Sequence, residues 1–294
     1  MSTPISDENA RALREIERLA GASGGASGTA APPPRRTGLA GYAHATRTAT
    51  YAFLASLPLF LLYEVGVVLA NQGTVGGEIR VGADVWIKQA LASLGVQGAL
   101  LLGAVVIVIG GVVFWMERER RPPLEARYFG GIVVESLVYA VVLAFLVSGL
   151  VGAVFGAALG IAPEAAGGAS GGVLLAAQSA MRQLSLPLQL ALSIGAGLYE
   201  ELVFRVLLVG GLFLVLKKLV ADQRVAYAVA AVAGALVFSA VHYMGSLGDA
   251  FELSSFTYRF VFGLALNGVF LLRGFAVAAW THALYDVLVV TGSL

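Results

Sequence analysis

The sequence predicts an all-α protein, a polytopic bundle of about seven helices that cross a membrane. The first observation is composition, because 58% of the residues are hydrophobic and only 13% are charged, whereas soluble domains carry about 25% charged residues. The second is a mean hydropathy of +0.84. The third is that the apolar residues gather in runs close to the roughly 20 residues that a helix needs to cross a bilayer.

Residues 1–47 differ from the rest because they contain little that could be buried. After a short charged stretch the chain reads GASGGASGTAAPPPRRTG, a composition that is typical of flexible linkers. We therefore predict a flexible cytoplasmic tail over 1–47 and a membrane domain over 48–294. The tail lacks the basic stretch and adjoining apolar core of a signal peptide, so the first span is expected to stay uncleaved.

Seven apolar runs follow the tail, and each is predicted to be a spanning helix. They are residues 49–70, 97–116, 129–159, 186–216, 226–244, 256–272 and 275–292. The stretch from Ala83 to Leu94 has apolar residues at helical spacing but is too short to span. It is expected to lie in the membrane interface or to re-enter the bilayer.

Lys and Arg residues predict the orientation of the bundle. They gather in the tail and in every second loop, at Arg35, Arg36, Arg47, Arg118, Arg120, Arg121, Arg127, Lys217, Lys218, Arg224 and Arg273. The loops between carry only Arg80, Lys88 and Arg182. Because loops rich in Lys and Arg stay in the cytoplasm, we expect the N-terminus inside and, with seven spans, the C-terminus outside.

The fourth apolar run contains Glu200, Glu201 and Arg205 within GLYEELVFR. Each charged side chain at the centre of a membrane helix costs roughly 2.5–3.5 kcal/mol, so such residues indicate a functional site by default. Glu201 and Arg205 have i,i+4 spacing and are predicted to form an ion pair. Glu200 lies about 100° further round the helix, which leaves its carboxylate available as a base.

Two later runs carry histidines. The fifth ends in FSAVHYMG, where His242 follows Phe238 by one helical turn, and the seventh contains WTHALYDVL, where His282 precedes Asp286 by one turn. At this spacing a carboxylate can orient an imidazole and set its tautomer. Two carboxylates and two histidines that converge in a bundle could activate a water molecule and stabilise an oxyanion.

Each of these polar groups, taken alone, also fits a structural role. A Glu–Arg pair can tie helices together, a histidine can join two helices by a hydrogen bond, and the pair in the seventh run could belong to a proton relay. Their combination on three late runs favours a catalytic site. For Glu64, Glu135 and Asn267 we expect structural roles, and we expect Arg259 near a membrane edge or paired with a carboxylate.

Depth along the helices raises a question about this site. With the predicted orientation, Glu200 lies near the middle of the bilayer and His242 near the outer end of its run. The two can meet only if the fifth helix starts later or tilts, or if Gly245 and Gly248 begin a re-entrant turn. This topology predicts a cavity in the middle or outer half of the membrane.

Three motifs together resemble one family. EELVFR matches EExxxR, FSAVH matches FxxxH and HALYD matches HxxxN/D of the CAAX-protease and bacteriocin-processing family (CPBP, or Abi). They occur in the family's order on successive late runs, over residues 185–292. The resemblance implies a membrane-embedded endopeptidase. Eukaryotic members cut the C-terminal tripeptide from prenylated proteins, and bacterial members are linked to peptide processing, bacteriocin immunity and removal of C-terminal anchoring signals.

The resemblance also implies roles for individual residues. Glu200 is expected to be the catalytic glutamate, which activates water together with His242. Glu201 and Arg205 are expected to hold the site together, and His282 to line the side where the oxyanion forms. Glutamate catalysis without a cofactor is favoured.

Residue 286 departs from the commonest family pattern. Many members carry Asn there, which can donate a hydrogen bond to an oxyanion, whereas an ionised Asp cannot. We therefore expect Asp286 to orient His282, or to be protonated in its buried setting. The alternative mechanism uses a catalytic zinc held by His242, His282 and Glu200, although the sequence contains no HExxH motif.

The favoured function is thus an intramembrane endopeptidase that hydrolyses a peptide bond in a membrane-anchored protein or peptide. The expected partners are this substrate and the lipid bilayer, and a net charge of +1 gives no indication of nucleic acid. The lack of cysteine excludes disulfides and thiol catalysis. A proton-coupled transporter and a non-catalytic immunity or scaffold protein remain as alternatives. The Ala-, Gly- and Arg-rich composition suggests a GC-rich bacterial genome, so the expected location is the bacterial inner membrane.

Overall fold

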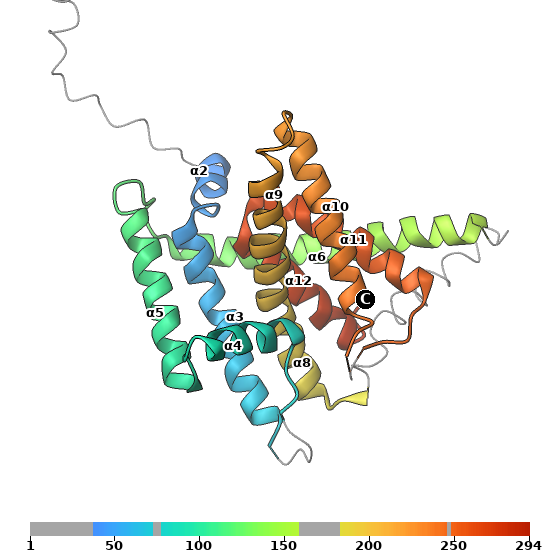
Figure 1. The fold of residues 1–294 in the computed structure, drawn as a ribbon, viewed down its shortest axis with the longest axis horizontal. Coiled ribbons are helices and arrows are strands. Elements are labelled where there is room, and N and C mark those ends of the chain that lie inside the picture. Colours follow the sequence, from blue (N-terminus) through green and yellow to red (C-terminus); the bar gives the residue numbers. More distant parts are fainter. Residues whose placement is uncertain (1–37, 73–77, 159–182, 246–247) are drawn as a thin grey trace, which may run out of the picture. The chain divides into compact units, whose positions relative to one another are not determined.

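The structure, a computed structural model, describes residues 38–72, 78–158, 183–245 and 248–294. Over these residues the chain is helical and forms no strand. The helices, shown in Figure 1, are α2 Gly38–Ala45, α3 Ala49–Ala70, α4 Gly82–Ser93, α5 Gly98–Met116, α6 Ala126–Ala158, α8 Leu186–Gly195, α9 Gly210–Leu216, α10 Gln223–Val241, α11 Leu253–Arg273 and α12 Phe275–Val290. Two π-helical stretches, η2 Ala196–Glu200 and η3 Leu202–Val209, connect α8 to α9.

Each of the seven predicted apolar runs is helical, so the predicted all-α membrane bundle is confirmed. By length and composition, α3, α6, α10 and α11 are long and apolar enough to cross a membrane, whereas the described part of α5 and the whole of α12 are shorter apolar helices. The fourth run is one continuous helical path. Between η2 and η3, Glu201 keeps right-handed helical angles, with φ −62° and ψ −37°.

The last helix, α12, lies at the centre of the packing. It contacts α3, α6, α8, η2 and α11, and Figure 1 shows α6 running across the direction of α3 and α9. The buried face of α12 is rich in alanine, with Ala276, Ala278, Ala279 and Ala283 all at most 2% exposed. Small side chains let helices approach closely where the surrounding lipid is itself apolar. This close approach brings helices from both halves of the chain to α12.

The membrane domain begins earlier than the sequence indicates. Residues 38–45, which the composition assigns to the tail, form α2, because Tyr42 gives this short segment something to bury. The Tyr42 hydroxyl donates a hydrogen bond of 2.6 Å to Glu135 of α6, and its ring lies edge-on to Tyr128 with centroids 5.4 Å apart. The rest of the predicted tail, residues 1–37, lies outside the described residues.

The outward faces of the long helices are apolar. Leu61 and Val65 of α3, Ile107 of α5, and Phe145 and Leu146 of α6 are each more than half exposed. Contiguous apolar surface of this kind is rare on soluble proteins and marks contact with a membrane or a partner. Together with the spanning lengths, it identifies an integral membrane protein.

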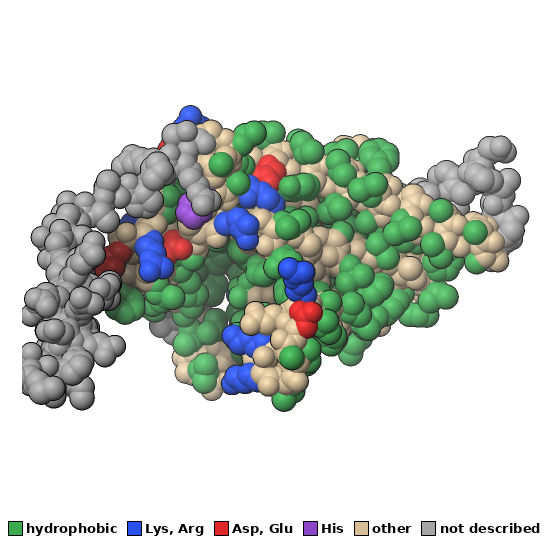
Figure 2. Space-filling model, turned by 90° about the horizontal axis from the view of Figure 1, so that it is seen from above, with side chains coloured by type: hydrophobic (Ala, Val, Ile, Leu, Met, Phe, Trp, Pro, Cys, Tyr) green, Lys and Arg blue, Asp and Glu red, His purple; other side chains and the backbone are tan. Residues whose placement is uncertain are grey.

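The two ends of the bundle differ in charge. The loops after α5 and α9 and the turn before α12 carry Arg118, Arg121, Lys217, Lys218 and Arg273. Figure 2 looks onto this end and shows Lys and Arg side chains among hydrophobic ones. The opposite end contains α4, the start of α8 and the end of α10 (Figure 1).

Candidate active site

Glu200 and Glu201 lie where the fourth run widens into π-helix. η2 ends at Glu200, and η3 begins two residues later. Such π-helical turns are rare and frequent at functional sites. Gly197 allows η2 to lie against α12, because a Cβ at this position would be 2.5 Å from the carbonyl oxygen of Ala279. Any larger residue would push η2 away from the helix that carries His282.

Glu201 is the centre of a buried ion cluster. Its Oε1 lies 2.9 Å from Nη1 of Arg205, which confirms the predicted i,i+4 pair, and 2.8 Å from Nδ1 of His282. Glu201 is fully buried and Arg205 is 1% exposed. The Arg205 guanidinium lies 4.5 Å from the ring centroid of Phe238 and donates to the carbonyl of Gly263. The Glu201–Arg205 pair thus joins the fourth run to α10, α11 and α12.

Glu200 points away from this cluster, toward His242. Its Oε2 lies 3.8 Å from Nε2 of His242 and, among the described residues, has no hydrogen-bond partner. Nδ1 of His242 lies 2.7 Å from the carbonyl oxygen of Phe238. Because a carbonyl only accepts, this contact assigns the proton to Nδ1, and Nε2 of the neutral ring presents its lone pair to Glu200. Two proton acceptors therefore face each other across a gap too wide for a direct hydrogen bond.

His282 and Asp286 lie one turn apart on α12, as their spacing predicts. Nε2 of His282 is 3.7 Å from Oδ2 of Asp286, but the short hydrogen bond of the ring is the one from Nδ1 to Glu201. Glu201 thus makes the shorter contact with this ring, and Asp286 lies beside its other nitrogen. The reason is that Nδ1 points across to the fourth run, a direction that spacing within one helix does not reveal.

The reactive side chains line one cavity of about 680 Å³. Glu200, His242, His282 and Asp286 all face it, whereas Glu201 does not. Six aromatic residues contribute to the wall, namely Trp86, Phe204, Phe238, Tyr258, Phe262 and Tyr285. A concave, mainly apolar cavity with a few convergent polar groups is the usual form of a small-molecule or peptide site.

His242 caps the end of α10, and a glycine turn follows it. α10 ends at Val241, earlier than the predicted residue 244, and Gly245 follows with φ +82°, a conformation that favours glycine. The chain then folds back, so that the backbone N–H of Asp249 donates to the carbonyl of His242 at 2.9 Å. Because His242 caps the end of α10, the cavity lies at the end of the bundle opposite the basic loops.

Several cavity residues are missed by the sequence analysis. Arg80 and Trp86 reach the cavity from α4 and the loop before it, and Asp249 and Arg259 reach it from α11 and the loop before that helix. Arg259 forms an ion pair with Asp249, in agreement with the expected carboxylate partner. The only sequence signal for Arg259 is a charge within an apolar run, which does not show that it faces this cavity.

The weaker candidates lie elsewhere and make structural contacts. Glu64 pairs with Lys88 at 2.8 Å, and the Asn267 side chain donates to the carbonyl of Ala231 at 2.9 Å. Glu135 belongs to a second hollow, described next. None of these three acidic or amide side chains lines the cavity of Glu200.

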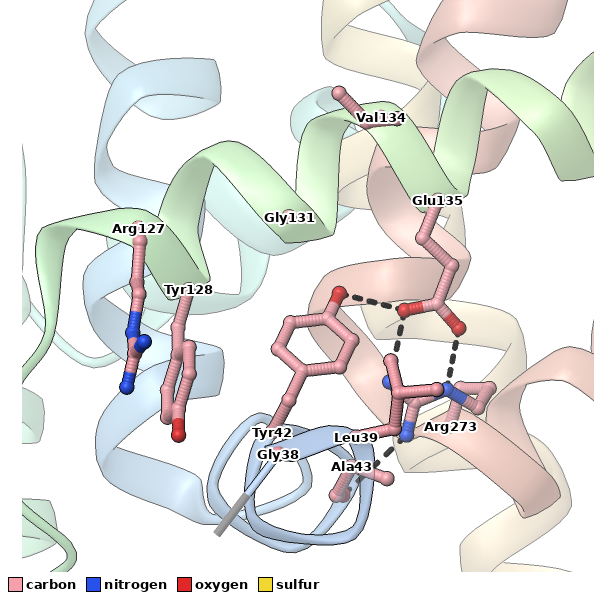
Figure 3. A pocket seen from close by; sticks show the side chains of 10 residues that line it. All are labelled: Gly38, Leu39, Tyr42, Ala43, Arg127, Tyr128, Gly131, Val134, Glu135 and Arg273. Carbon is pink, nitrogen blue, oxygen red and sulfur yellow. Dashed lines mark hydrogen bonds and ion pairs between the residues drawn. The ribbon is translucent and has the colours of Figure 1, made fainter.

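The second hollow, of about 690 Å³, lies between α2, α6 and the turn before α12 (Figure 3). Within it, Glu135 accepts hydrogen bonds from Tyr42 at 2.6 Å and from Nη2 of Arg273 at 2.8 Å. Arg273 also donates to the carbonyl of Ala43. Because both oxygens of Glu135 are occupied, this hollow ties α2 to the bundle and offers no available base there.

The arrangement of possible metal ligands bears on the zinc alternative. Within the described residues, no group of three His, Asp or Glu side chains is placed to hold a metal ion. In both histidines Nδ1 is engaged, by Phe238 in His242 and by Glu201 in His282, so Nε2 is the nitrogen that would remain for a metal.

Residues 182–288 match the family model described as type II CAAX prenyl endopeptidase, Rce1-like. The match runs from just before α8 into α12 and includes the six candidate residues from the sequence analysis, Glu200, Glu201, Arg205, His242, His282 and Asp286. No curated protein and no solved structure matches the chain. The matched segment is also the one that carries the three motifs and the charged face of the cavity. Residues 182–288, which carry the three motifs, are thus similar to the type II CAAX prenyl endopeptidase family over about a third of the chain.

Proposed function

We propose that this protein is an intramembrane endopeptidase that hydrolyses a peptide bond in a membrane-anchored protein or peptide, with Glu200 and His242 activating the water. One observation carries the proposal. Oε2 of Glu200 is buried beside the cavity, 3.8 Å from Nε2 of His242, and no described residue donates a hydrogen bond to it. A buried polar atom without a partner is costly and requires an explanation. A reactant water that bonds to both groups supplies one.

The reaction follows from these two acceptors. The water donates one hydrogen to Oε2 of Glu200 and the other to Nε2 of His242. Glu200 takes the first proton while the water oxygen bonds to the carbonyl carbon of the substrate, whose oxygen becomes an oxyanion. Glu200 then gives this proton to the leaving nitrogen as the C–N bond breaks, which restores the carboxylate.

His282 is the proposed donor to the oxyanion. Glu201 holds its Nδ1–H, so the ring is fixed with Nε2 toward the cavity, beside Asp286. In its imidazolium form His282 can donate from Nε2 as the oxyanion develops. A donor aimed at developing charge is worth about 2.7–4 kcal/mol in other enzymes. Glu201 and Arg205 are positioning residues in this scheme, because they hold the ring and do not line the cavity.

The end of the bundle at which the cavity lies indicates where the substrate would be cut. It lies opposite the basic loops, which the distribution of Lys and Arg assigns to the cytoplasm, so we propose that it opens toward the outer half of a bacterial inner membrane. The aromatic wall suits an apolar segment. The proposed substrate is therefore a peptide or protein anchored in the bilayer and cut near the outer end of its anchor.

The test compares purified wild type, Glu200→Gln and His242→Ala in lipid nanodiscs. The substrates are a library of C-terminally anchored peptides, and cleavage is detected by mass spectrometry with and without a chelator. We expect both variants to lose cleavage and chelation to leave the wild type active. Loss of wild-type cleavage on chelation, with recovery on adding zinc, would instead assign Glu200, His242 and His282 to a metal site. Variants that keep full activity would overturn the enzyme assignment.

A further inference from the structure

One wall of the cavity comes from outside the segment that matches the family. This wall is lined by Val81, Gly82, Ala83, Val85 and Trp86, in the same cavity as Glu200 and His242. They precede the matched residues 182–288 by almost a hundred positions. The reacting groups thus come from the shared segment, whereas the α4 wall (residues 81–86) is contributed by the part of the chain that carries no family motif.

The α4 wall is fixed by an ion network. Lys88 lies 2.8 Å from Glu64 and 2.9 Å from Asp84, and Arg80 lies 3.2 Å from Glu64 and 3.0 Å from Asp84. Asp84 is fully buried. Each carboxylate therefore has two cationic partners, which is the condition under which buried charges are tolerated. Because Glu64 belongs to α3, the network fixes α4 to the transmembrane core.

Two tyrosines connect this network to η2, the π-helical stretch that carries Glu200. The Tyr63 hydroxyl donates to Asp84 at 2.8 Å, and the Tyr199 hydroxyl donates to Glu64 at 2.9 Å. The two rings lie edge-on, with centroids 5.2 Å apart. Tyr199 directly precedes Glu200 in η2. The α4 wall is thus held at a fixed distance from the catalytic carboxylate.

Trp86 is the residue of this wall with the largest exposed apolar face. Its side chain is 46% exposed although it lines the cavity, and its ring packs edge-on against Phe204 with centroids 6.5 Å apart. Phe204 in turn packs against Phe238, four residues before His242. A rigid aromatic surface therefore runs from Trp86 toward the water-activating histidine.

We propose that Trp86 is a specificity-determining residue for the proposed peptidase, because its indole forms the surface against which a bulky apolar side chain next to the cleaved bond packs. This inference rests on the proposed function. Aromatic surfaces of this size favour large apolar groups, and a pocket discriminates by roughly 10- to 200-fold between side chains that differ by a methylene group. Substrates with alanine beside the cleaved bond gain nothing from the indole.

The experiment uses the full chain in lipid nanodiscs and a single-span peptide that the wild type cleaves. The residues on both sides of the cleaved bond are replaced in turn by Ala, Leu and Phe. Trp86→Ala is expected to lower kcat/KM for the Leu and Phe peptides by about 10- to 100-fold and to change the Ala peptides less than about threefold. Trp86→Phe is expected to restore most of the preference. The matched control is Trp115→Ala, since Trp115 is 66% exposed on α5, away from the cavity.

An equal loss on all peptides, or no change on any, would overturn the role of Trp86. A second measurement does not need cleavage. The photoreactive residue p-benzoylphenylalanine replaces Trp86 in a Glu200→Gln background and is irradiated with the Phe peptide, with the same replacement at Trp115 as control. Cross-linking from position 86 alone is expected, and its absence would also overturn the inference. If the wild type cleaves nothing while this cross-link forms, the proposed function fails and the peptide contact at Trp86 stands.

Discussion

Two polar clusters meet at consecutive residues of the fourth run, and they differ in how completely their charges are paired. On one side of the junction, Tyr199 joins the ion network of α3 and α4, where each carboxylate has cationic partners within 3.2 Å. On the other side, Glu200 faces His242 at 3.8 Å, and its Oε2 has no described hydrogen-bond donor. The same residue types thus form a network of ion pairs in one place and a gap between Glu200 and His242 in the other. The pairing of carboxylates with cations, more than residue type, distinguishes the two regions.

The largest effect is expected at the unsaturated carboxylate. Glu200→Gln removes the proposed general base without removing a hydrogen bond, so kcat should fall by roughly 10²–10⁴-fold while the unfolding midpoint hardly moves. The measurement pairs cleavage kinetics with thermal unfolding in the same detergent. A variant that retains more than a tenth of the wild-type kcat would erase the distinction between the two clusters.

The unfolding free energy should fall most when one partner of the buried Glu201–Arg205 pair is removed. Arg205→Met leaves the fully buried Glu201 with His282 as its remaining short contact, and removal of one member of a buried pair costs about 3–5 kcal/mol of unfolding free energy. Unfolding in mixed micelles with increasing SDS measures this loss. The double variant Glu201→Gln with Arg205→Met is expected to recover part of it. If the double variant is as unstable as the single one, the pair does not act as a unit.

The same Glu-to-Gln change in the ion network of α3 and α4 should lower stability and leave cleavage unchanged. Glu64→Gln weakens its contacts with Lys88, Arg80 and Tyr199, but Asp84 keeps both cations. A hydrogen bond to a charged group is worth about 1.5–3 kcal/mol, so the loss of unfolding free energy should be near this range. The measurement is SDS unfolding alongside cleavage of an Ala peptide. A fall in kcat as large as that of Glu200→Gln would contradict this reading.

The smallest effect concerns a carboxylate at the basic end of the bundle. Glu117 follows α5 and accepts hydrogen bonds of 2.8 Å from the backbone N–H groups of Ala49 and Thr50, at the start of α3. Burial alone would raise the pKa of Glu117, but hydrogen bonding by Thr50 and Ala49, together with the charge of Arg121, outweighs it and lowers the pKa below its ordinary value. A carboxylate at a helix N-terminus stabilises by about 0.5–1 kcal/mol.

The sign of the pH dependence follows from that lowered pKa. The stabilisation by Glu117 is fully present above the pKa of the unfolded chain and is lost as the pH falls through the folded pKa. Glu117→Gln should therefore destabilise the protein at pH 7 and make little difference in strong acid. Unfolding free energies measured from pH 7 down to strong acid test the expectation. Glu119→Gln is the control, because Glu119 is exposed and pairs with Arg118 at the surface. A constant difference at all pH values would contradict it.

The sequence predicts the parts of this protein that depend on local periodicity. Apolar runs identify the helices, and i,i+4 spacing identifies the pair of Glu201 and Arg205 and the shared face of His282 and Asp286. What it does not predict depends on contacts between helices. The π-helical turns, the hydrogen bond from His282 to Glu201 and the α4 wall arise from packing across the bundle, which leaves no spacing signal. The boundary at α2 is missed because one tyrosine is hidden in a Gly- and Ala-rich segment.

The central place of α12 has a consequence for biosynthesis. This helix supplies His282 and Asp286, and it follows every other element of the site in chain order. Glu200 and His242 are therefore synthesised before His282 and Asp286. Until α12 is made, Glu201 has no His282 ring to bind. The proposed site would therefore be complete only after α12 has packed against the helices that precede it.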